Sequence, residues 1–315
     1  MSVAFIFPGQ GSQDVGMGQA LMAASPEARA ALDEADAALG GGLHKMLAEG
    51  PVEVLKQTAN TQPAILTVSV AAHRAFVQRA GKKLDGAPVA MAGHSLGEWS
   101  AMVATGAFTL TDAVRAVRQR GQFMQEAVPA GEGAMAAILG LEPKAVAEAC
   151  AEVEKLSGRT VSCANFNSPE QTVIAGHADA VERTIALLKG RGAKRALPLP
   201  VSAPFHCALM APVQPRLEAV LRGMFISTMA VPVWSNVSAA PNQDSAVAVR
   251  QLIEQVVAPV RWVETIEKLA ASGVDTLVEL GPGKVLAGLT RRIDKKLRTF
   301  SIEDEKSLDA CVNEI

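Results

Sequence analysis

The sequence predicts an α/β protein with a large parallel sheet and a second, smaller unit inserted into its chain. Short apolar runs alternate with amphipathic helical stretches over much of the 315 residues, which is the pattern of a parallel sheet covered on both faces. Between residues 129 and 200 the order of elements changes. Hydrophobic residues make up 49% of the chain and charged residues 20%, which suits a globular protein that can bury a sizeable core.

The first part of the chain alternates between strands and helices. The apolar run over residues 3–7 is stopped by the Gly-rich stretch "PGQGSQ" and predicts a buried strand that leads into a tight turn. Ser25, followed by Pro26 and Glu27, marks the start of a helix over residues 25–39. The same reasoning predicts a strand at 87–92 and helices at 62–80, 96–106 and 110–128.

The middle of the chain predicts a strand-helix-strand-strand-helix-strand order, which is the split βαβ or ferredoxin-like unit. Its expected strands are 133–140, 160–167, 171–177 and 194–201, and its helices are 142–153 and 179–192. Alternation then returns, with strands at 232–237 and 276–282 and helices at 260–273 and 284–293. We therefore expect residues 1–128 and 201–315 to form one large subdomain and residues 129–200 to form the insert.

Composition excludes several classes of function. The net charge of −2 creates no global attraction to nucleic acid or to anionic lipid. The four cysteines have neither disulfide-framework nor zinc-site spacing, so we expect reduced thiols and no metal. No signal peptide is recognisable, and the longest uncharged stretch, residues 223–243, is too polar to span a bilayer. We expect a cytoplasmic protein without nucleic-acid or membrane partners.

The pentapeptide "GHSLG", residues 93–97, predicts an activated serine. It fits G-x-S-x-G and lies between an apolar strand and a helix, which is the context that this motif needs. A sharp strand-to-helix turn lifts the Ser95 hydroxyl out of the sheet, and larger side chains at Gly93 and Gly97 would clash. The helix N-terminus presents unpaired N–H groups, among them that of Leu96, which can bind an oxyanion. A purely structural turn is the weaker interpretation.

An activated serine needs a base, and the sequence offers five histidines. His44 and His73 fall in helical patterns and are expected at the surface or in packing. His94 neighbours the serine, but successive side chains at a strand end point to opposite faces. His177 is expected in a loop or at a helix cap. His206, in an extended Pro-containing segment before a helix, is the candidate base by elimination, although the long chain that follows it argues against an ordinary esterase or lipase.

One arginine stands out by its position on a predicted helix. Arg120 has apolar neighbours one turn away on either side, namely Ala116, Val117 and Met124. Arg115 and Arg118 fall on another face and are expected to be solvated. A guanidinium buried in an apolar stripe needs an anion, and its planar fork pairs with a carboxylate. Arg120 is therefore a candidate carboxylate-binding residue.

Two Gly-rich stretches raise the alternative of a nucleotide-binding module. The stretch "GQGSQDVGMG" has Asp14 where the dinucleotide fingerprint requires its third glycine. The stretch "GPGKV", residues 281–285, lacks the earlier glycine of a phosphate-binding P-loop, since Val278 stands there, and lacks a Ser or Thr after the lysine. Both patterns argue against nucleotide binding.

A further alternative is a non-catalytic scaffold protein. It requires that Ser95 or His206 does no chemistry.

Seven short motifs together resemble the malonyl-CoA:acyl-carrier-protein transacylases, the acyltransferases of fatty-acid synthesis. In chain order they are "FPGQGSQ", "TQPAIL", "GHSLGE", "RGQFMQEAVP", "NFNSPEQTVIAG", "FHCALM" and "ELGPGKVLAGL". The resemblance implies an α/β-hydrolase-like subdomain with a ferredoxin-like insert. It implies that Ser95 is the nucleophile, that His206 is its base, and that the backbone N–H groups of Gln10 and Leu96 form the oxyanion hole. A backbone carbonyl, expected at Ala258, would orient the histidine.

The resemblance also implies the substrates. Arg120 would bind the free malonyl carboxylate, Gln62 would contribute to substrate binding, and Phe205 would favour malonyl over methylmalonyl groups. The malonyl group would pass from malonyl-CoA through Ser95 to the phosphopantetheine thiol of acyl carrier protein, without a cofactor, in an enzyme expected to be a monomer. Two basic clusters could steer an acidic carrier: Lys189, Arg191, Lys194 and Arg195, and Arg291, Arg292, Lys295 and Lys296. The alternative function is a serine thioesterase or hydrolase, which differs in admitting water to the acyl-enzyme.

Overall fold

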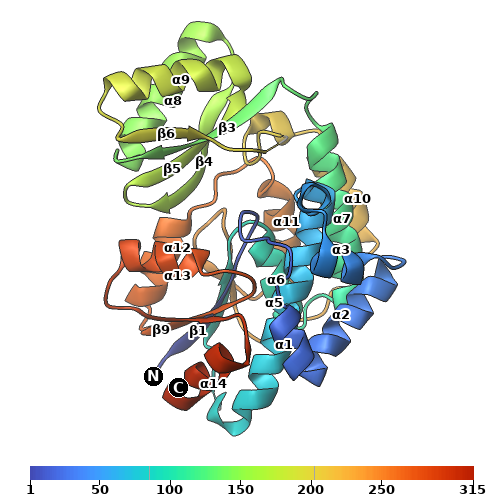
Figure 1. Ribbon diagram of the computed structural model, residues 1–315. Coiled ribbons are helices and arrows are strands. Elements are labelled where there is room, and N and C mark those ends of the chain that lie inside the picture. Colours follow the sequence, from blue (N-terminus) through green and yellow to red (C-terminus); the bar gives the residue numbers. More distant parts are fainter. Residues whose placement is uncertain (85, 202) are drawn as a thin grey trace.

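Two sheets of different kind organise the structure, a computed structural model that describes residues 1–84, 86–201 and 203–315 (Figure 1). The larger sheet has six strands in the order β10-β9-β1-β2-β7-β8, and all its neighbours are parallel except the pair β7-β8. The predicted parallel sheet is thereby confirmed, with a short antiparallel strand added at one edge. Its strands are β1 (Val3–Phe7), β2 (Ala90–Gly93), β7 (Val233–Trp234), β8 (Pro241–Asn242), β9 (Thr276–Leu280) and β10 (Arg298–Ile302).

Helices cover both faces of the larger sheet (Figure 1). Along β1, Phe5 and Phe7 belong to the core beneath α5, α6 and α7, whereas Ala4 and Ile6 belong to the core beneath α12 and α13. This alternation explains why all of β1 is apolar and buried. The helices associated with this sheet are α1 (Gln19–Ala24), α2 (Pro26–Ala38), α3 (Leu43–Glu49), α4 (Val52–Leu55), α5 (Thr58–Ala80), α6 (Leu96–Ala104), α7 (Leu110–Glu126), α10 (Val213–Arg222), α11 (Ser245–Glu254), α12 (Trp262–Ala271), α13 (Val285–Ile293) and α14 (Glu305–Glu314), with the 3₁₀ turns η1 (Gly81–Leu84) and η2 (Ala208–Met210).

The smaller sheet has four antiparallel strands in the order β4-β5-β3-β6. Its helices α8 and α9 pack on the face turned away from the larger sheet (Figure 1). Along β3, Ala136 and Ile138 join the core under these helices, and Met135 and Ala137 turn to the opposite face, toward the rest of the molecule. The six elements follow the predicted order: β3 (Gly133–Leu139), α8 (Pro143–Ser157), β4 (Val161–Ser168), β5 (Gln171–His177), α9 (Ala178–Gly190) and β6 (Arg195–Pro198).

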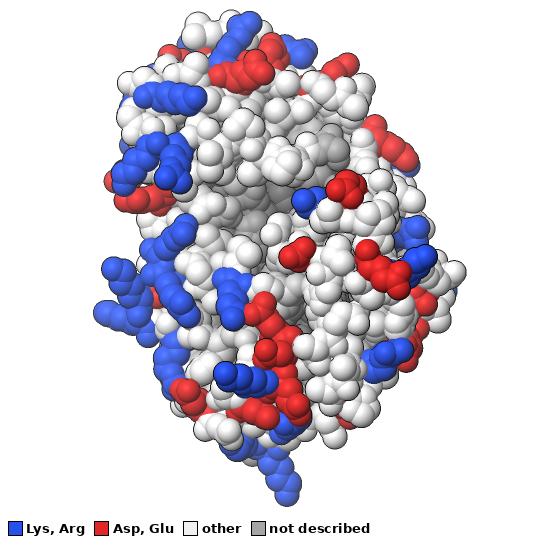
Figure 2. Space-filling view, in the orientation of Figure 1, with Lys and Arg blue, Asp and Glu red and all other residues white. Residues whose placement is uncertain are grey.

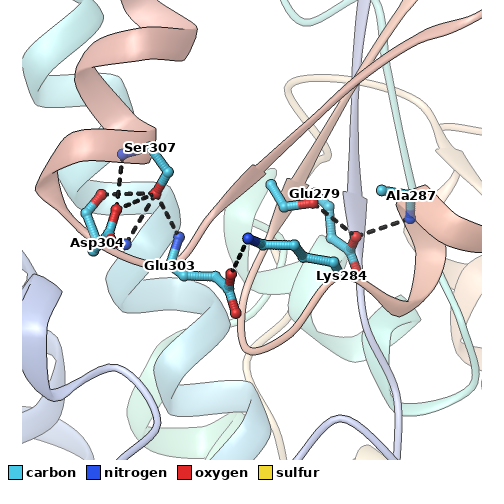
Figure 3. Close-up of polar contacts among 7 residues, drawn as sticks. Glu279, Lys284, Ala287, Glu303, Asp304 and Ser307 are labelled. Atoms are coloured by element: carbon cyan, nitrogen blue, oxygen red, sulfur yellow. Dashed lines mark hydrogen bonds and ion pairs between the residues drawn. The ribbon is translucent and has the colours of Figure 1, made fainter.

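Several elements were not predicted from the sequence, namely α1, α3, α4, α11, α14, β8 and β10. Strand β10 carries partly exposed side chains and follows a charged segment, so it lacks the apolar run by which buried strands are recognised. Helix α14 begins at a capping box in which Asp304 and Ser307 exchange hydrogen bonds (Figure 3). The expected strand at 232–237 is reduced to Val233–Trp234. In the described part of the chain, no helix is long and apolar enough to cross a membrane.

Candidate active site

The turn that carries Ser95 is a strained strand-to-helix connection. Strand β2 ends at Gly93, α6 begins at Leu96, and Ser95 between them has φ 51° and ψ −103°, a conformation that L-residues rarely adopt. A Cβ at Gly93 would lie 1.9 Å from the backbone carbon of Gly97, and a Cβ at Gly97 would lie 2.0 Å from the carbonyl oxygen of Phe7. The prediction that both flanking positions must be glycine is confirmed.

An asparagine that the sequence analysis missed stabilises this turn. Asn236 follows β7, next to β2 in the sheet, and its Oδ1 accepts a hydrogen bond of 2.6 Å from the Ser95 N–H. Its Nδ2 donates to the carbonyl oxygen of Gly93, also at 2.6 Å. The expected strand at 232–237 contained Asn236; because β7 ends at Trp234, the residue instead lies just beyond the carboxyl edge of the parallel sheet, where functional polar residues gather.

The Ser95 hydroxyl contacts the predicted base. Ser95 Oγ lies 2.8 Å from His206 Nε2, and His206 Nδ1 lies 2.8 Å from the carbonyl oxygen of Gln255. The Nδ1 partner is therefore the carbonyl oxygen of Gln255, and the prediction of Ala258 is wrong. The backbone of Ala258 has only a small effect, which raises the pKa of the imidazole. Burial, and secondarily the charge of Arg120, lowers the pKa of His206 to about 3. The imidazole is neutral near pH 7, donates to Gln255 through Nδ1–H, and offers Nε2 as an acceptor.

The two backbone N–H groups expected to bind an oxyanion lie close to this pair. Leu96 is the first residue of α6, and Gln10 lines the same cleft as Ser95. Neither N–H donates a hydrogen bond to another group in the described ranges. The side-chain oxygen of Gln10 accepts from Gln62 Nε2 at 3.3 Å.

Arg120 is fully buried, as its place on the helix predicts, whereas Arg115 is exposed. Its Nη1 donates to Gln62 Oε1 at 2.8 Å, and its Nη2 donates to Gln255 Oε1 at 3.0 Å and lies 3.3 Å from Ser95 Oγ. All of these partners are neutral, and Nε has no partner among the described residues. Burial lowers the pKa of Arg120 to about 10, so the guanidinium stays charged at neutral pH. The site thus holds a desolvated cation within reach of the serine.

A cleft of about 350 Å³ gives access to Ser95 and His206 between the two sheets. Figure 2 shows the hollow between the upper and lower parts of the molecule, with few charged side chains at its surface. Phe205, 94% buried, lines this cleft beside apolar residues of the small sheet, namely Met135, Ala137 and Val173. His94 lines it too, and its Nε2 lies 2.8 Å from Asn167 Oδ1. Its ring packs against Trp262, with ring centroids 5.7 Å apart, whereas the hydroxyl of Ser95 contacts His206.

The remaining histidines lie where the sequence indicated. His44 pairs with Asp33 at 2.8 Å on the surface. His73 is packed against Phe5 and Phe7, with ring centroids 5.9 Å and 6.3 Å apart. His177 occupies the position before the first residue of α9.

The helix N-terminus that follows the "GPGKV" segment already binds a carboxylate of the protein itself. Glu279 accepts hydrogen bonds from the backbone N–H groups of Leu286 and Ala287 at 3.0 Å and 2.9 Å, at the start of α13 (Figure 3). Lys284 pairs with Glu303 at 2.9 Å. The donors and the lysine that a phosphate would need are therefore engaged, which agrees with the prediction against nucleotide binding.

Comparison with known proteins identifies similar chains over the full length. Residues 4–306 match the family described as acyl transferase domain. The malonyl CoA-acyl carrier protein transacylase of Salmonella typhimurium is 49% identical over 311 residues, 99% of each chain. An acyl carrier protein S-malonyltransferase of Vibrio cholerae, of known structure, is 48% identical with a TM-score of 0.94 and covers 99% of this chain and 100% of its own. A malonyl-transacylase solved in complex with a type II PKS acyl-carrier protein is 45% identical with a TM-score of 0.96 over 100% of both chains.

Proposed function

The chain belongs to the acyl transferase domain family, among the malonyl-CoA:acyl-carrier-protein transacylases, and from this premise we propose that it transfers malonyl groups through an acyl-enzyme on Ser95. The observation that carries this mechanism is the 2.8 Å contact between Ser95 Oγ and a neutral His206, with the buried Arg120 3.3 Å from the same oxygen. A nucleophile, a base and a carboxylate-binding cation converge on one point of the cleft.

In the first half-reaction, Ser95 Oγ attacks the thioester carbonyl of malonyl-CoA while its proton passes to His206 Nε2. The Gln255 carbonyl holds the imidazole through Nδ1–H and stabilises the imidazolium that forms. The tetrahedral oxyanion is stabilised by the Gln10 and Leu96 N–H groups, each of which is worth about 10²–10³-fold in rate. The C–S bond then breaks, and CoA leaves as a thiol with the proton from His206.

The second half-reaction runs the same steps in reverse order. The phosphopantetheine thiol of the carrier protein gives its proton to His206, and its sulfur attacks the serine ester. The C–O bond breaks, and Ser95 regains its proton from the imidazolium. One thiol, that of CoA, is released in the first half-reaction, and another, that of the carrier protein, is consumed in the second. Ser95 and His206 return to their starting protonation states, so protons and charges balance without a cofactor.

Selectivity for malonyl follows from Arg120. Its guanidinium is held by two amide oxygens, those of Gln62 and Gln255, and points at the Ser95 oxygen that carries the acyl group. A carboxylate two bonds beyond the acyl carbonyl would pair with it in a desolvated site. Phe205, beside the base, limits the space around the α-carbon and favours malonyl over branched groups.

The carrier protein reaches this cleft across basic side chains. All eight residues of the two predicted clusters are exposed. Lys194 and Arg195 of the first cluster and Arg292 of the second line one hollow, which shares Gln171 with the catalytic cleft. Figure 2 shows Lys and Arg concentrated along one side of the molecule. A basic rim would steer an acidic carrier toward the cleft and would do so less at high salt.

The same proposal covers the subdomains and the location. We assign residues 1–128 and 201–315 to an α/β-hydrolase-like catalytic subdomain and residues 129–200 to a ferredoxin-like insert, supported by the division of strands between the two sheets. We place the enzyme in the cytoplasm, where the four buried free cysteines would remain reduced.

Release of CoA with and without carrier protein tests transfer against hydrolysis. A transferase releases CoA in a burst equal to the enzyme present and then continues only when phosphopantetheinylated carrier is added. Rapid steady release of CoA in carrier-free buffer would instead make the protein a thioesterase, because it would mean that water reaches the acyl-enzyme.

A further inference from the structure

A buried carboxylate beneath the Ser95 turn has no role in the proposed mechanism. Glu98, in the first turn of α6, is only 3% exposed. Its Oε2 accepts a 3.0 Å hydrogen bond from the Asn236 backbone N–H and a 2.7 Å hydrogen bond from Gln255 Nε2. Burying a carboxylate is costly unless it is well paired, so its place here calls for a reason beyond packing.

Gln255 connects this carboxylate to three parts of the candidate active site. Its Nε2 donates to Glu98 and to the Ser95 carbonyl oxygen at 3.1 Å, and its Oε1 accepts from Arg120 at 3.0 Å. Its backbone carbonyl accepts from His206 Nδ1. Gln255 thus orients both the base and the guanidinium, and a contact that holds its side chain in place also helps to hold these two groups.

Only one orientation of the Gln255 amide satisfies its neighbours. Arg120 has donors alone, and an ionised Glu98 has acceptors alone. The amide lies between them with its oxygen toward Arg120 and its NH₂ toward Glu98. The reversed amide would place NH₂ against the guanidinium and oxygen against the carboxylate. The carboxylate is the nearest and the only charged acceptor on that side; without it, the NH₂ would keep only the longer contacts to the Ser95 carbonyl oxygen at 3.1 Å and to Asn236 Oδ1 at 3.4 Å.

We propose that Glu98 is a positioning residue that locks the Gln255 amide, and thereby holds His206 and Arg120 in register with Ser95. This inference rests on the proposed function, since the aligned groups are those of the malonyl-transfer mechanism. Glu98 does not touch substrate; it acts through Gln255, and through Asn236 it also supports the Ser95 turn.

Two substitutions at Glu98 separate hydrogen bonding from burial. Glu98→Gln retains an oxygen that can accept from both donors, whereas Glu98→Leu has similar bulk and no acceptor. We expect Glu98→Leu to lower kcat for malonyl transfer by about 10- to 100-fold, the loss typical of a small misplacement of catalytic groups, and to raise KM for malonyl-CoA several-fold. Glu98→Gln should restore kcat to within about threefold of wild type. Burial raises the pKa of Glu98 to about 7, so the assay is run at about pH 8, where it is ionised.

Glu279 provides a matched control. It is another fully buried carboxylate that accepts two hydrogen bonds from main-chain N–H groups, but it caps α13 and contacts none of the proposed catalytic residues (Figure 3). Glu279→Leu should reduce thermal stability and leave kcat and KM of the folded enzyme within about twofold of wild type.

The result separates this inference from the proposed function. Wild-type protein that fails to transfer malonyl in the same assay contradicts the function itself. With an active wild type, three outcomes overturn the role of Glu98: unchanged kinetics in Glu98→Leu, the same loss in Glu98→Gln as in Glu98→Leu, or the same loss in Glu279→Leu. If Glu98→Leu does not fold, Gln255→Leu replaces it, because it removes the held side chain and keeps the backbone carbonyl; wild-type kinetics in that variant would overturn the inference.

Discussion

Replacing Arg120 with alanine should convert a malonyl-selective enzyme into one that discriminates poorly. The guanidinium is fully buried and lies 3.3 Å from Ser95 Oγ, so it can meet the carboxylate of a bound malonyl group without intervening water. Two hydrogen bonds to a charged group are worth about 3–6 kcal/mol together. We therefore expect kcat/KM for malonyl-CoA to fall by about 10²–10⁴-fold, since each 1.4 kcal/mol is about tenfold. The acetyl group of acetyl-CoA has no carboxylate for Arg120 to bind, so its kcat/KM should change by less than about tenfold.

Steady-state CoA release with each thioester, in the presence of carrier protein, measures this ratio directly. Arg115→Ala is the control, because Arg115 lies on the same helix with its side chain exposed, and its ratio should equal that of wild type. An equal loss for both thioesters in Arg120→Ala would refute the reasoning, since it would mean that Arg120 only supports the Ser95 turn. An unchanged ratio would refute it as well.

Three further perturbations follow from the geometry. His206→Ala should slow malonyl loading by about 10²–10⁴-fold while near-UV circular dichroism stays native; loading at the wild-type rate would exclude it as the base. Gly97→Ala should lower the free energy of unfolding by about 1–3 kcal/mol or more, because its Cβ would lie 2.0 Å from the Phe7 carbonyl, whereas Gly288→Ala in open space within α13 should not destabilise; denaturant melts that rank them alike would contradict this. Burial lowers the pKa of His73 to about 4, so between pH 6.5 and 4 the unfolded chain binds a proton at this residue and the folded chain does not. The free energy of unfolding should therefore fall by about 3 kcal/mol as the pH is lowered over this range. His73→Phe should flatten the dependence of stability on pH between 6.5 and 4, and identical profiles of variant and wild type would argue against this role.

The residues predicted from the sequence are those whose role follows from local pattern. Ser95 is fixed by the two glycines that its turn requires, and Arg120 by its position in an apolar stripe. His206 was reached by elimination and then by resemblance. The inferences for Ser95 and Arg120 need only the neighbours along the chain, whereas the inference for His206 compared positions across the whole sequence.

The support around these residues could not be predicted, because it depends on how distant segments meet. The carbonyl that orients the base was expected at Ala258 and lies at Gln255, just after α11 ends, where the direction of a carbonyl depends on the turn. Glu98 reads in sequence as an acidic residue favoured in the first turn of any helix. Only the contacts that Asn236 and Gln255, from the segments after β7 and α11, make with Glu98 show that this carboxylate is buried and paired.

Some of the fold was missed for a related reason. Strand β10 and helix α14 come late in the chain. Strand β10 has no fully apolar face, and α14 buries only a short apolar stripe of Leu308, Cys311 and Val312. Their positions follow from pairing with β9 and from the cap at Asp304, which are tertiary and local polar interactions rather than hydrophobic periodicity. Hydrophobic periodicity correctly predicted the buried strands, but it gives no signal for partly exposed strands at the edge of a sheet.

Intact-protein mass spectrometry after brief mixing with malonyl-CoA tests the covalent mechanism most directly. The mass should rise by one malonyl group, peptide mapping should place the group on Ser95, and addition of phosphopantetheinylated carrier protein should remove it. An unmodified wild-type protein, or an adduct that persists in Ser95→Ala, would contradict the mechanism.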